Sequence, residues 1–266
     1  MMAINRNAES HEVRRPDDTS IRYTVSGSAV GPAMVLVHGW GCDRHDFDAI
    51  IAHLPRQLRV LAIDLAEHGD SRSTRGTWTM EEFARDVAAV LEAESVGSCV
   101  VVGHSMGRAV AVETARLLPH TVTRVVALDA LHYLSLFPAQ EEHAAEALLR
   151  PFREDFAGAM RGMVESGSPP GTDPALMDAY TKKMSAMRQP AGLHALEALV
   201  HWDMDAALHE GSQPITLFAV RTIITQEAID RYGHRMRIDL VDLGSHHFHA
   251  ESPEATVGLL AAEMSD

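Results

Sequence analysis

The sequence predicts an α/β fold with a doubly wound, mostly parallel sheet, and three observations support this fold class. Short, continuously apolar runs such as AMVLV at 33–37 are typical of parallel strands that helices cover on both faces. Segments with helical spacing alternate with these runs along the chain. The chain has 266 residues, of which 46% are hydrophobic, so it can bury one large core.

The first half of the chain contains five expected strands. Ser20 to Gly27 alternates between polar and apolar residues, so we expect it to pair antiparallel with the residues before Pro16 at one edge of the sheet. Continuous apolar runs predict the other strands at 33–37, 59–64, 98–102 and 122–129. Helices are expected at 46–54, after Thr79 and at 107–118, and Thr79 with Glu82 predicts a capping box at the second of these.

The second half of the chain resumes the sheet after a helical insertion. Helical spacing dominates from about 131 to 210, with a loop at 166–174. An insertion at the carboxyl edge of a parallel sheet is well placed to cover a ligand, so we expect a lid at 131–210 directly after the strand that ends at Asp129. Residues 1–130 and 211–266 then form the core, with strands at 215–220 and 237–243 and a closing helix at 253–264.

Composition argues against several classes of partner. The formal net charge is −14 at pH 7 and no dense run of Lys and Arg occurs, which disfavours nucleic-acid binding. Cys42 and Cys99 are far apart, so we expect reduced, partly buried thiols. The N-terminal residues lack the apolar core of a secretory signal, and no run approaches the roughly 18 apolar residues of a membrane span. We expect a cytoplasmic monomer or homodimer that acts on a small-molecule substrate without metal or cofactor.

A nucleophilic serine is predicted where the central strand ends. The run SCVVV at 98–102 stops at Gly103-His104-Ser105-Met106-Gly107, and an Ala-rich helix begins immediately behind it. In such a strand-to-helix corner, side chains at the two glycine positions would collide, and one hydroxyl is pushed out above the sheet. Ser105 is therefore the candidate nucleophile. A serine hydroxyl is unreactive at neutral pH, so it needs a base and a group that orients the base.

Four stretches of the chain occur in the order of a known family: VLVHGWG at 35–41, AIDLAEHGDS at 62–71, VVVGHSMG at 100–107 and GSHHFHAESPEA at 244–255. With these stretches the chain resembles the α/β-hydrolase superfamily. The residues CDR at 42–44 and LDALH at 128–132 look most like its lidded, single-domain bacterial esterase-like branch. The resemblance implies a catalytic triad in the chain order nucleophile, acid, base, and it implies no particular substrate.

The predicted base lies in the loop after the last strand. The spacing from His246 to Glu251 and Pro253 is similar to the family's H-x-x-x-x-E-x-P pattern. His246 is therefore the predicted base. His247 and His249 are the alternatives, and both are otherwise ordinary loop histidines.

The predicted acid is Asp129. Many relatives carry the acid after the strand corresponding to 215–220, but here the following residues offer no aspartate in the expected turn. Some branches of the superfamily place it at the tip of the preceding strand, where this chain has Asp129. A buried carboxylate without a partner is costly, which favours a catalytic role, although Asp129 as a cap for the lid is the alternative. Glu227 and Asp230 are the other acids weighed for this role.

Five further residues are candidates for binding. By position, the backbone N–H groups of Trp40 and Met106 form the oxyanion hole, and the Trp40 side chain can wall the acyl pocket. His38 and His104 flank the centre, where they either contact the substrate or brace the loops by hydrogen bonds. Trp202 belongs to a group of lid side chains rich in methionine that either lines an apolar pocket or packs the helices together.

Two positions depart from the family pattern. Relatives often have glycine at the positions of Arg108 and Glu67. We expect Arg108 either to pair with Glu67 or to point to solvent.

The predicted activity is hydrolysis of a carboxylic ester of a small, largely apolar substrate through an acyl-enzyme on Ser105. The substrate can instead be an amide, lactone or thioester that is cleaved through the same acyl-enzyme. The alternative is a cofactor-independent dioxygenase of a hydroxyquinolone-type heterocycle, in which the His246–Asp129 pair is the base. A third hypothesis is a non-enzymatic ligand receptor that keeps only the pocket.

Overall fold

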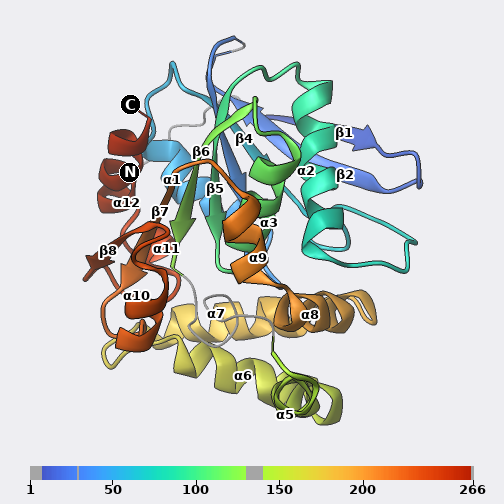
Figure 1. Cartoon of the computed structure of the whole chain (residues 1–266), viewed down its shortest axis with the longest axis vertical. Helices are drawn as coiled ribbons and strands as arrows, with labels where there is room; N and C mark the ends of the chain where they lie inside the picture. Colours follow the sequence, from blue (N-terminus) through green and yellow to red (C-terminus); the bar gives the residue numbers. More distant parts are fainter. Residues whose placement is uncertain (1–7, 29, 130–139, 265–266) are drawn as a thin grey trace.

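The computed structural model describes residues 8–28, 30–129 and 140–264, and within these ranges it contains one eight-stranded sheet (Figure 1). Its strands are β1 (Glu9–Arg14), β2 (Ser20–Ser26), β3 (Ala33–Val37), β4 (Arg59–Ile63), β5 (Cys99–His104), β6 (Val122–Leu128), β7 (Ile215–Val220) and β8 (Arg237–Val241). Their order across the sheet is β1-β2-β4-β3-β5-β6-β7-β8. The β1–β2 and β2–β4 pairs are antiparallel and all the others are parallel. The predicted α/β fold with an antiparallel edge pair is confirmed.

Helices cover both faces of this sheet. On one face α2 (Met80–Ala93) packs against α3 (Met106–Leu117), and on the other α1 (Asp48–His53) packs against α12 (Pro253–Glu263) (Figure 1). Shorter helices lie in the connections: η1 (Arg44–Phe47), α10 (Gln226–Tyr232) and α11 (Phe248–Glu251). None of the helices in the described ranges is both long and apolar enough to cross a membrane.

The predicted helical insertion follows β6. It contains α5 (Glu142–Glu154), α6 (Phe156–Ser166), α7 (Pro174–Ser185), α8 (Ala191–His201) and α9 (Met204–Glu210). Figure 1 shows α5, α6, α7 and α8 as a layer beyond one end of the sheet. The loop between α6 and α7 lies where the sequence predicts it. The first residues of the expected lid, 131–139, lie outside the described residues.

The core is built around the central strands. Every residue of β3, β4 and β5 is buried, which explains why their apolar residues run continuously between the polar ends Arg59 of β4 and His104 of β5 instead of alternating. Cys42 and Cys99 are free thiols inside this core. Both are more fully buried than expected, because Cys99 lies in a central strand and Cys42 lies in the turn that the lid covers.

Helix starts differ from the sequence prediction at two places. Thr79 caps α2 by accepting a hydrogen bond from the backbone N–H of Glu82 at 3.3 Å, as expected. The Glu82 carboxylate does not complete a capping box, because it pairs with the Arg15 guanidinium at 3.0 Å, a stronger donor than a neutral amide. A reciprocal box occurs instead between Asp43 and Asp46. It starts η1 and thereby divides the helix expected at 46–54.

Two glycines allow the sharp corner between β5 and α3. A Cβ atom on Gly107 would lie 2.2 Å from the carbonyl oxygen of Val37 in β3, and a Cβ on Gly103 would lie 2.2 Å from the carbonyl oxygen of Gly107. Both distances are far below van der Waals contact, so only glycine fits at either position. The first turn of α3 can therefore pass directly over β3, and the chain reverses at Ser105.

We expect Gly107→Ala to lower the free energy of unfolding by about 3 kcal/mol or more, because the added methyl group must displace the backbone of β3. Gly162→Ala is the matched control, since a Cβ at this exposed position of α6 meets no atom within 4 Å. Alanine there should raise stability by about 0.5–1 kcal/mol through its better helix propensity. Urea unfolding followed by circular dichroism measures both changes. Equal stability of the two variants would contradict the packing argument.

Candidate active site

Ser105 lies in the corner between β5 and α3. Its φ of +52° with ψ of −119° is a conformation that residues other than glycine rarely adopt. The Ser105 backbone N–H points to the carbonyl oxygens of Leu128 and Asp129, at 3.3 and 3.2 Å, which ties the corner to the end of β6. Ser105 is half-buried and lines a pocket between the sheet and the lid.

The structure brings His246 and Asp129 together. His246 Nδ1 lies 2.7 Å from Asp129 Oδ2, and both side chains are buried. The other carboxylate oxygen, Oδ1, accepts a hydrogen bond from the backbone N–H of Val220 at 2.9 Å. With Nδ1 engaged by the carboxylate, Nε2 is the nitrogen of His246 left for proton transfer. His246 lines the same pocket as Ser105.

The loop that carries His246 is held from two sides. The His246 backbone N–H donates to the carbonyl oxygen of Gly167 in the lid at 2.8 Å. Its own carbonyl oxygen lies 3.0 Å from His104 Nε2, on the strand that leads to Ser105. His246 is therefore positioned by the lid as well as by the core.

The geometry around Trp40 and Met106 suits an oxyanion hole. Gly39 to Cys42 form a tight turn, closed by a 3.1 Å hydrogen bond from Cys42 N–H to the Gly39 carbonyl oxygen, with Gly41 at a φ of +72°. A Cβ on Gly39 would lie 3.1 Å from Ser105 Cβ, so this turn adjoins the corner. Among the described residues, no backbone carbonyl accepts from the N–H of Trp40, or from that of Met106 at the start of α3.

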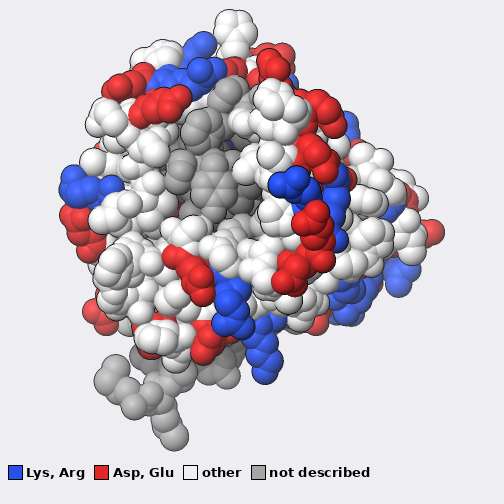
Figure 2. Space-filling view, turned by 90° about the horizontal axis from the view of Figure 1, so that it is seen from below, with Lys and Arg blue, Asp and Glu red and all other residues white. Residues whose placement is uncertain are grey.

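The pocket in front of Ser105 is mainly apolar. Its described lining comes from the turn, the corner, the histidine loop and lid helices α6, α7 and α8. Apolar or sulfur-containing side chains at these positions are Trp40, Cys42, Met163, Val164, Met184, Leu196 and Leu199. Figure 2 shows the face of the molecule that carries the lid, where acidic and basic side chains are interleaved instead of forming one patch of a single sign.

Two predicted binding residues lie outside this described lining. His38 is fully buried, with Nδ1 2.7 Å from the Gly39 carbonyl oxygen and Nε2 accepting from Leu65 N–H at 3.0 Å. His38 therefore braces the turn by hydrogen bonds, which is one of the two roles expected for it; the other was contact with the substrate. The expected substrate contact of Trp202 needs correction, because its Nε1–H donates to Glu113 at 2.7 Å and the ring packs on α3. His104, by contrast, both braces the histidine loop and lines the pocket.

The alternative acids, Glu227 and Asp230, and the alternative bases, His247 and His249, do not form an acid–base contact like the one between His246 and Asp129 in the described structure. Glu227 is exposed on α10, and Asp230 accepts a hydrogen bond from Gln226 on the same helix at 2.8 Å. His247 lines the pocket but stacks on Tyr180. Neither ring nitrogen of His249 has a hydrogen-bond partner in the described structure. Of the three histidines in this loop, His246 is the one whose ring contacts the Asp129 carboxylate in the described structure.

Burial lowers the pKa values of the histidines around His246. It lowers the pKa of His104 and His247 well below 6.5, and the neighbouring imidazoles add to the effect. It also lowers the pKa of His249, to about 4. These three rings are therefore neutral at pH 7.

Arg108 and Glu67 do not meet, and Arg108 does not reach solvent. Arg108 is fully buried under α9, with its guanidinium 5.4 Å from the Trp202 ring and 3.4 Å from Met204 Sδ. No carboxylate contacts it among the described residues, and burial lowers its pKa to about 10. Glu67 instead accepts from Arg188 Nε at 2.8 Å. Both expectations for Arg108 are wrong, because its position on α3 faces the end of the insertion.

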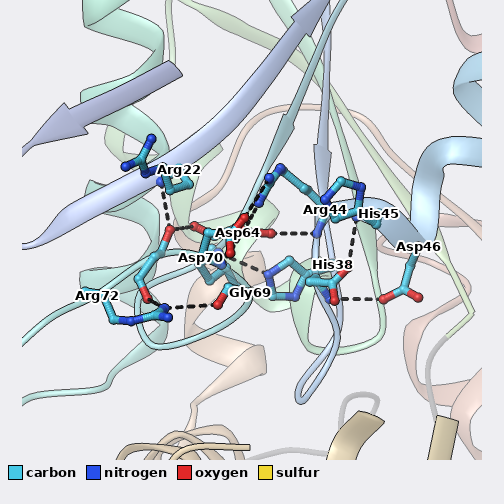
Figure 3. Close-up of polar contacts among 12 residues, drawn as sticks. Arg22, His38, Arg44, His45, Asp46, Asp64, Gly69, Asp70 and Arg72 are labelled. Carbon is cyan, nitrogen blue, oxygen red and sulfur yellow. Dashed lines mark hydrogen bonds and ion pairs between the residues drawn. The ribbon is translucent and has the colours of Figure 1, made fainter. Parts of the chain in front are cut away.

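A buried carboxylate at the end of β4 supports the loop beside the site. Asp64 accepts a hydrogen bond from the Arg44 backbone N–H at 2.7 Å and pairs with the Arg44 side chain, while Asp70 N–H donates to it at 2.8 Å (Figure 3). A Cβ on Gly69 would lie 2.2 Å from this carboxylate, which explains the glycine. The cluster joins the loop after β4 to the segment that follows the Trp40 turn.

Three contacts of the site lie beyond what the sequence pattern predicts. They come from the Gly167 carbonyl, the Tyr180 ring and the Lys183 ammonium, all in the lid. The only sequence signal is that Tyr180 and Lys183, three residues apart, share one face of a helix. That spacing does not say which surface the face meets. Within the described part of the chain, no cluster of three or more His, Cys, Asp or Glu side chains could hold a metal ion.

Comparisons with known proteins agree with the fold. A family model described as "alpha/beta hydrolase fold" matches residues 32–192. The pimeloyl-[acyl-carrier protein] methyl ester esterase of Methylococcus capsulatus is 31% identical over 200 residues, which cover 72% of this chain and 76% of the esterase. The karrikin insensitive 2 receptor CA of Petunia hybrida is 22% identical over 241 residues, covering 85% of this chain and 89% of the receptor. A solved thermophilic esterase from Thermogutta terrifontis has a TM-score of 0.82 at 20% identity, covering 97% of this chain and 98% of that one.

We expect Arg108→Met to raise the free energy of unfolding by about 1–3 kcal/mol, because it removes a buried charge that has no carboxylate partner while keeping most of the volume. Arg75→Met is the comparison, since the Arg75 side chain is only 6% exposed and pairs with Asp86 at 2.7 and 2.9 Å. That variant should lose about 3–5 kcal/mol, because it leaves Asp86 without one of its cations. Thermal and urea unfolding at pH 7 measure both. Destabilisation by Arg108→Met would show that the charge has a partner.

We expect the protein to lose stability as the pH falls from 6.5 toward 4. The unfolded chain protonates His249 near pH 6.5, whereas the folded chain does so only near pH 4, so the unfolded state binds the extra proton in this window. Each pH unit then costs up to about 1.4 kcal/mol for this residue. His249→Phe should reduce the pH dependence by up to one proton, as measured by urea unfolding at pH 7, 6 and 5. An unchanged slope would contradict the assignment.

Proposed function

The chain belongs to the α/β-hydrolase family, and we propose that it is a serine hydrolase that cleaves a carboxylic ester through an acyl-enzyme on Ser105. The observation that carries the proposal is the 2.7 Å contact between His246 Nδ1 and Asp129 Oδ2, in a buried site whose pocket is also lined by Ser105. A carboxylate on Nδ1 holds the imidazole in the tautomer whose Nε2 can accept a proton. The relatives named as esterases make hydrolysis the first activity to test.

The proposed reaction begins with attack of Ser105 Oγ on the ester carbonyl carbon. His246 Nε2 takes the hydroxyl proton, and Asp129 stabilises the imidazolium that forms. The carbonyl oxygen becomes negatively charged and receives hydrogen bonds from the backbone N–H groups of Trp40 and Met106. His246 then gives its proton to the departing alcohol, which leaves an acyl-enzyme. A water molecule next attacks the acyl carbon while His246 Nε2 takes a proton from it, and His246 returns this proton to Ser105 Oγ as the acid product leaves.

The lining of the pocket supports a small, uncharged, largely apolar acyl group. No Lys, Arg, Asp or Glu side chain is among the described lining residues. His104 and His247 are neutral at pH 7, because burial lowers their pKa values well below 6.5. A charged acyl chain would lose its hydration in this pocket without gaining a counter-ion. An amide, lactone or thioester of such an acyl group would form the same acyl-enzyme.

We expect a fluorophosphonate probe to label Ser105 and p-nitrophenyl butyrate to be hydrolysed. Ser105→Ala should abolish labelling, and Asp129→Asn should lower kcat by about 10³- to 10⁴-fold, because the imidazole loses its orienting partner. Glu227→Gln is the control and should leave both readouts unchanged, since Glu227 is an exposed residue of α10.

Other outcomes would support the other hypotheses. A folded wild-type protein that neither reacts with the probe nor hydrolyses esters would contradict the proposal. Oxygen uptake with a hydroxyquinolone that survives Ser105→Ala but not His246→Ala would indicate the dioxygenase. Tight binding of a small molecule without turnover would indicate a receptor.

A further inference from the structure

One face of lid helix α7 touches both loops that carry the proposed catalytic groups. Tyr180 and Lys183 lie three residues apart on this helix, so both side chains are on the same face. Tyr180 reaches the histidine loop, and Lys183 reaches the segment that follows the Trp40 turn. The helix therefore bridges two parts of the core that are about 200 residues apart in the sequence.

Lys183 forms ion pairs with both aspartates of the capping box that starts η1. Asp43 uses Oδ1 to accept from the His45 backbone N–H at 2.9 Å, and Asp46 uses Oδ2 to accept from the Asp43 N–H at 3.0 Å. The remaining oxygen of each carboxylate faces Lys183 Nζ, at 3.0 Å for Asp43 and 2.8 Å for Asp46. One ammonium group from the lid thus joins two carboxylates that already fix the start of η1.

No other cation takes this place in the described structure. Arg44, the basic residue between the two aspartates, directs its side chain to Asp64 and Asp70. The Asp46 side chain is only 8% exposed, so water screens little of its charge. Without Lys183, two carboxylates would face each other directly after the turn that carries Trp40. Their repulsion would favour opening of that turn.

Tyr180 restrains the other loop, which carries His246, by a ring contact. Its ring stacks on His247, with ring centroids 3.5 Å apart and planes inclined by 23°. His247 follows His246 directly, and the His246 N–H is bonded to Gly167 at the other end of the α6–α7 connection. Contacts from one lid segment therefore restrain the proposed base and the proposed oxyanion turn together.

We propose that Lys183 is a positioning residue of the active site, which holds the Trp40 turn against Ser105 through Asp43 and Asp46. The inference rests on the proposed function, because the turn matters to catalysis only if the Trp40 N–H binds the oxyanion. That N–H gains most of its hydrogen bond as negative charge develops in the transition state. Displacing it therefore lowers kcat and leaves the binding of a neutral ester nearly unchanged.

The test compares Lys183→Met with Lys183→Arg in steady-state hydrolysis of p-nitrophenyl butyrate. We expect Lys183→Met to lower kcat by about 10- to 100-fold with KM within about threefold of the wild-type value. Lys183→Arg keeps the charge and should recover most of kcat. Arg153→Met is the matched control, since it removes a lid ion pair whose partners Glu146 and Glu197 also belong to the lid. Its kcat should equal that of the wild type.

Hydrogen exchange of the backbone amides of residues 39–46 gives a readout that does not need activity. We expect faster exchange in this segment for Lys183→Met and wild-type exchange for Lys183→Arg. If Lys183→Met does not fold, Lys183→Gln replaces it, because glutamine keeps a polar side chain but removes the positive charge that faces Asp43 and Asp46. Wild-type kcat, or wild-type exchange in 39–46, for the charge-removing variant would overturn the inference. A wild-type protein with no esterase activity would refute the proposed function alone, and the exchange data would still decide whether Lys183 holds the turn.

Discussion

The structure depends on how closely the first turn of α3 passes the end of β3. Gly107 lies against the Val37 carbonyl with no room for a side chain, and Gly103 lies equally close to Gly107. This contact forces the chain to reverse within Ser105, which adopts a positive φ. Because β3, β5 and β6 are neighbouring parallel strands, the loops that follow them emerge at one edge of the sheet. Trp40, Ser105 and Asp129 therefore meet there.

Burial has different consequences for the polar groups at this edge. Asp129 is fully buried but has a partner for each oxygen, His246 and the Val220 N–H. Burial lowers the pKa of the histidines around His246, so they stay uncharged and add no competing positive charge at pH 7. Arg108 is the exception, since it is buried without a carboxylate in the described structure, and no feature of the proposed chemistry explains it.

The insertion does more than cover the pocket. The Trp40 indole N–H donates to the Gly192 carbonyl at 2.8 Å, and the His246 N–H donates to Gly167. Lys183 and Arg188 add ion pairs to the loops after β3 and β4. Movement of the lid would therefore disturb the same groups that the proposed reaction uses. Since the relatives of this chain include both esterases and a receptor, such side-chain contacts, rather than the fold, have to decide what the protein does.

The sequence by itself indicated a mostly parallel sheet with an antiparallel edge pair and a corner at Ser105, and its resemblance to the α/β-hydrolase superfamily selected Asp129 and His246 as candidates. The sheet and the corner follow from local signals, namely continuous apolar runs and two glycines around a serine. The tertiary structure alone decided which surfaces face each other. It buried Arg108 and Trp202 against one another, paired Glu67 with Arg188, and set Lys183 between Asp43 and Asp46. Helical spacing specifies a face but not its partner, because long-range packing of a lid against loops is a property of the whole folded chain.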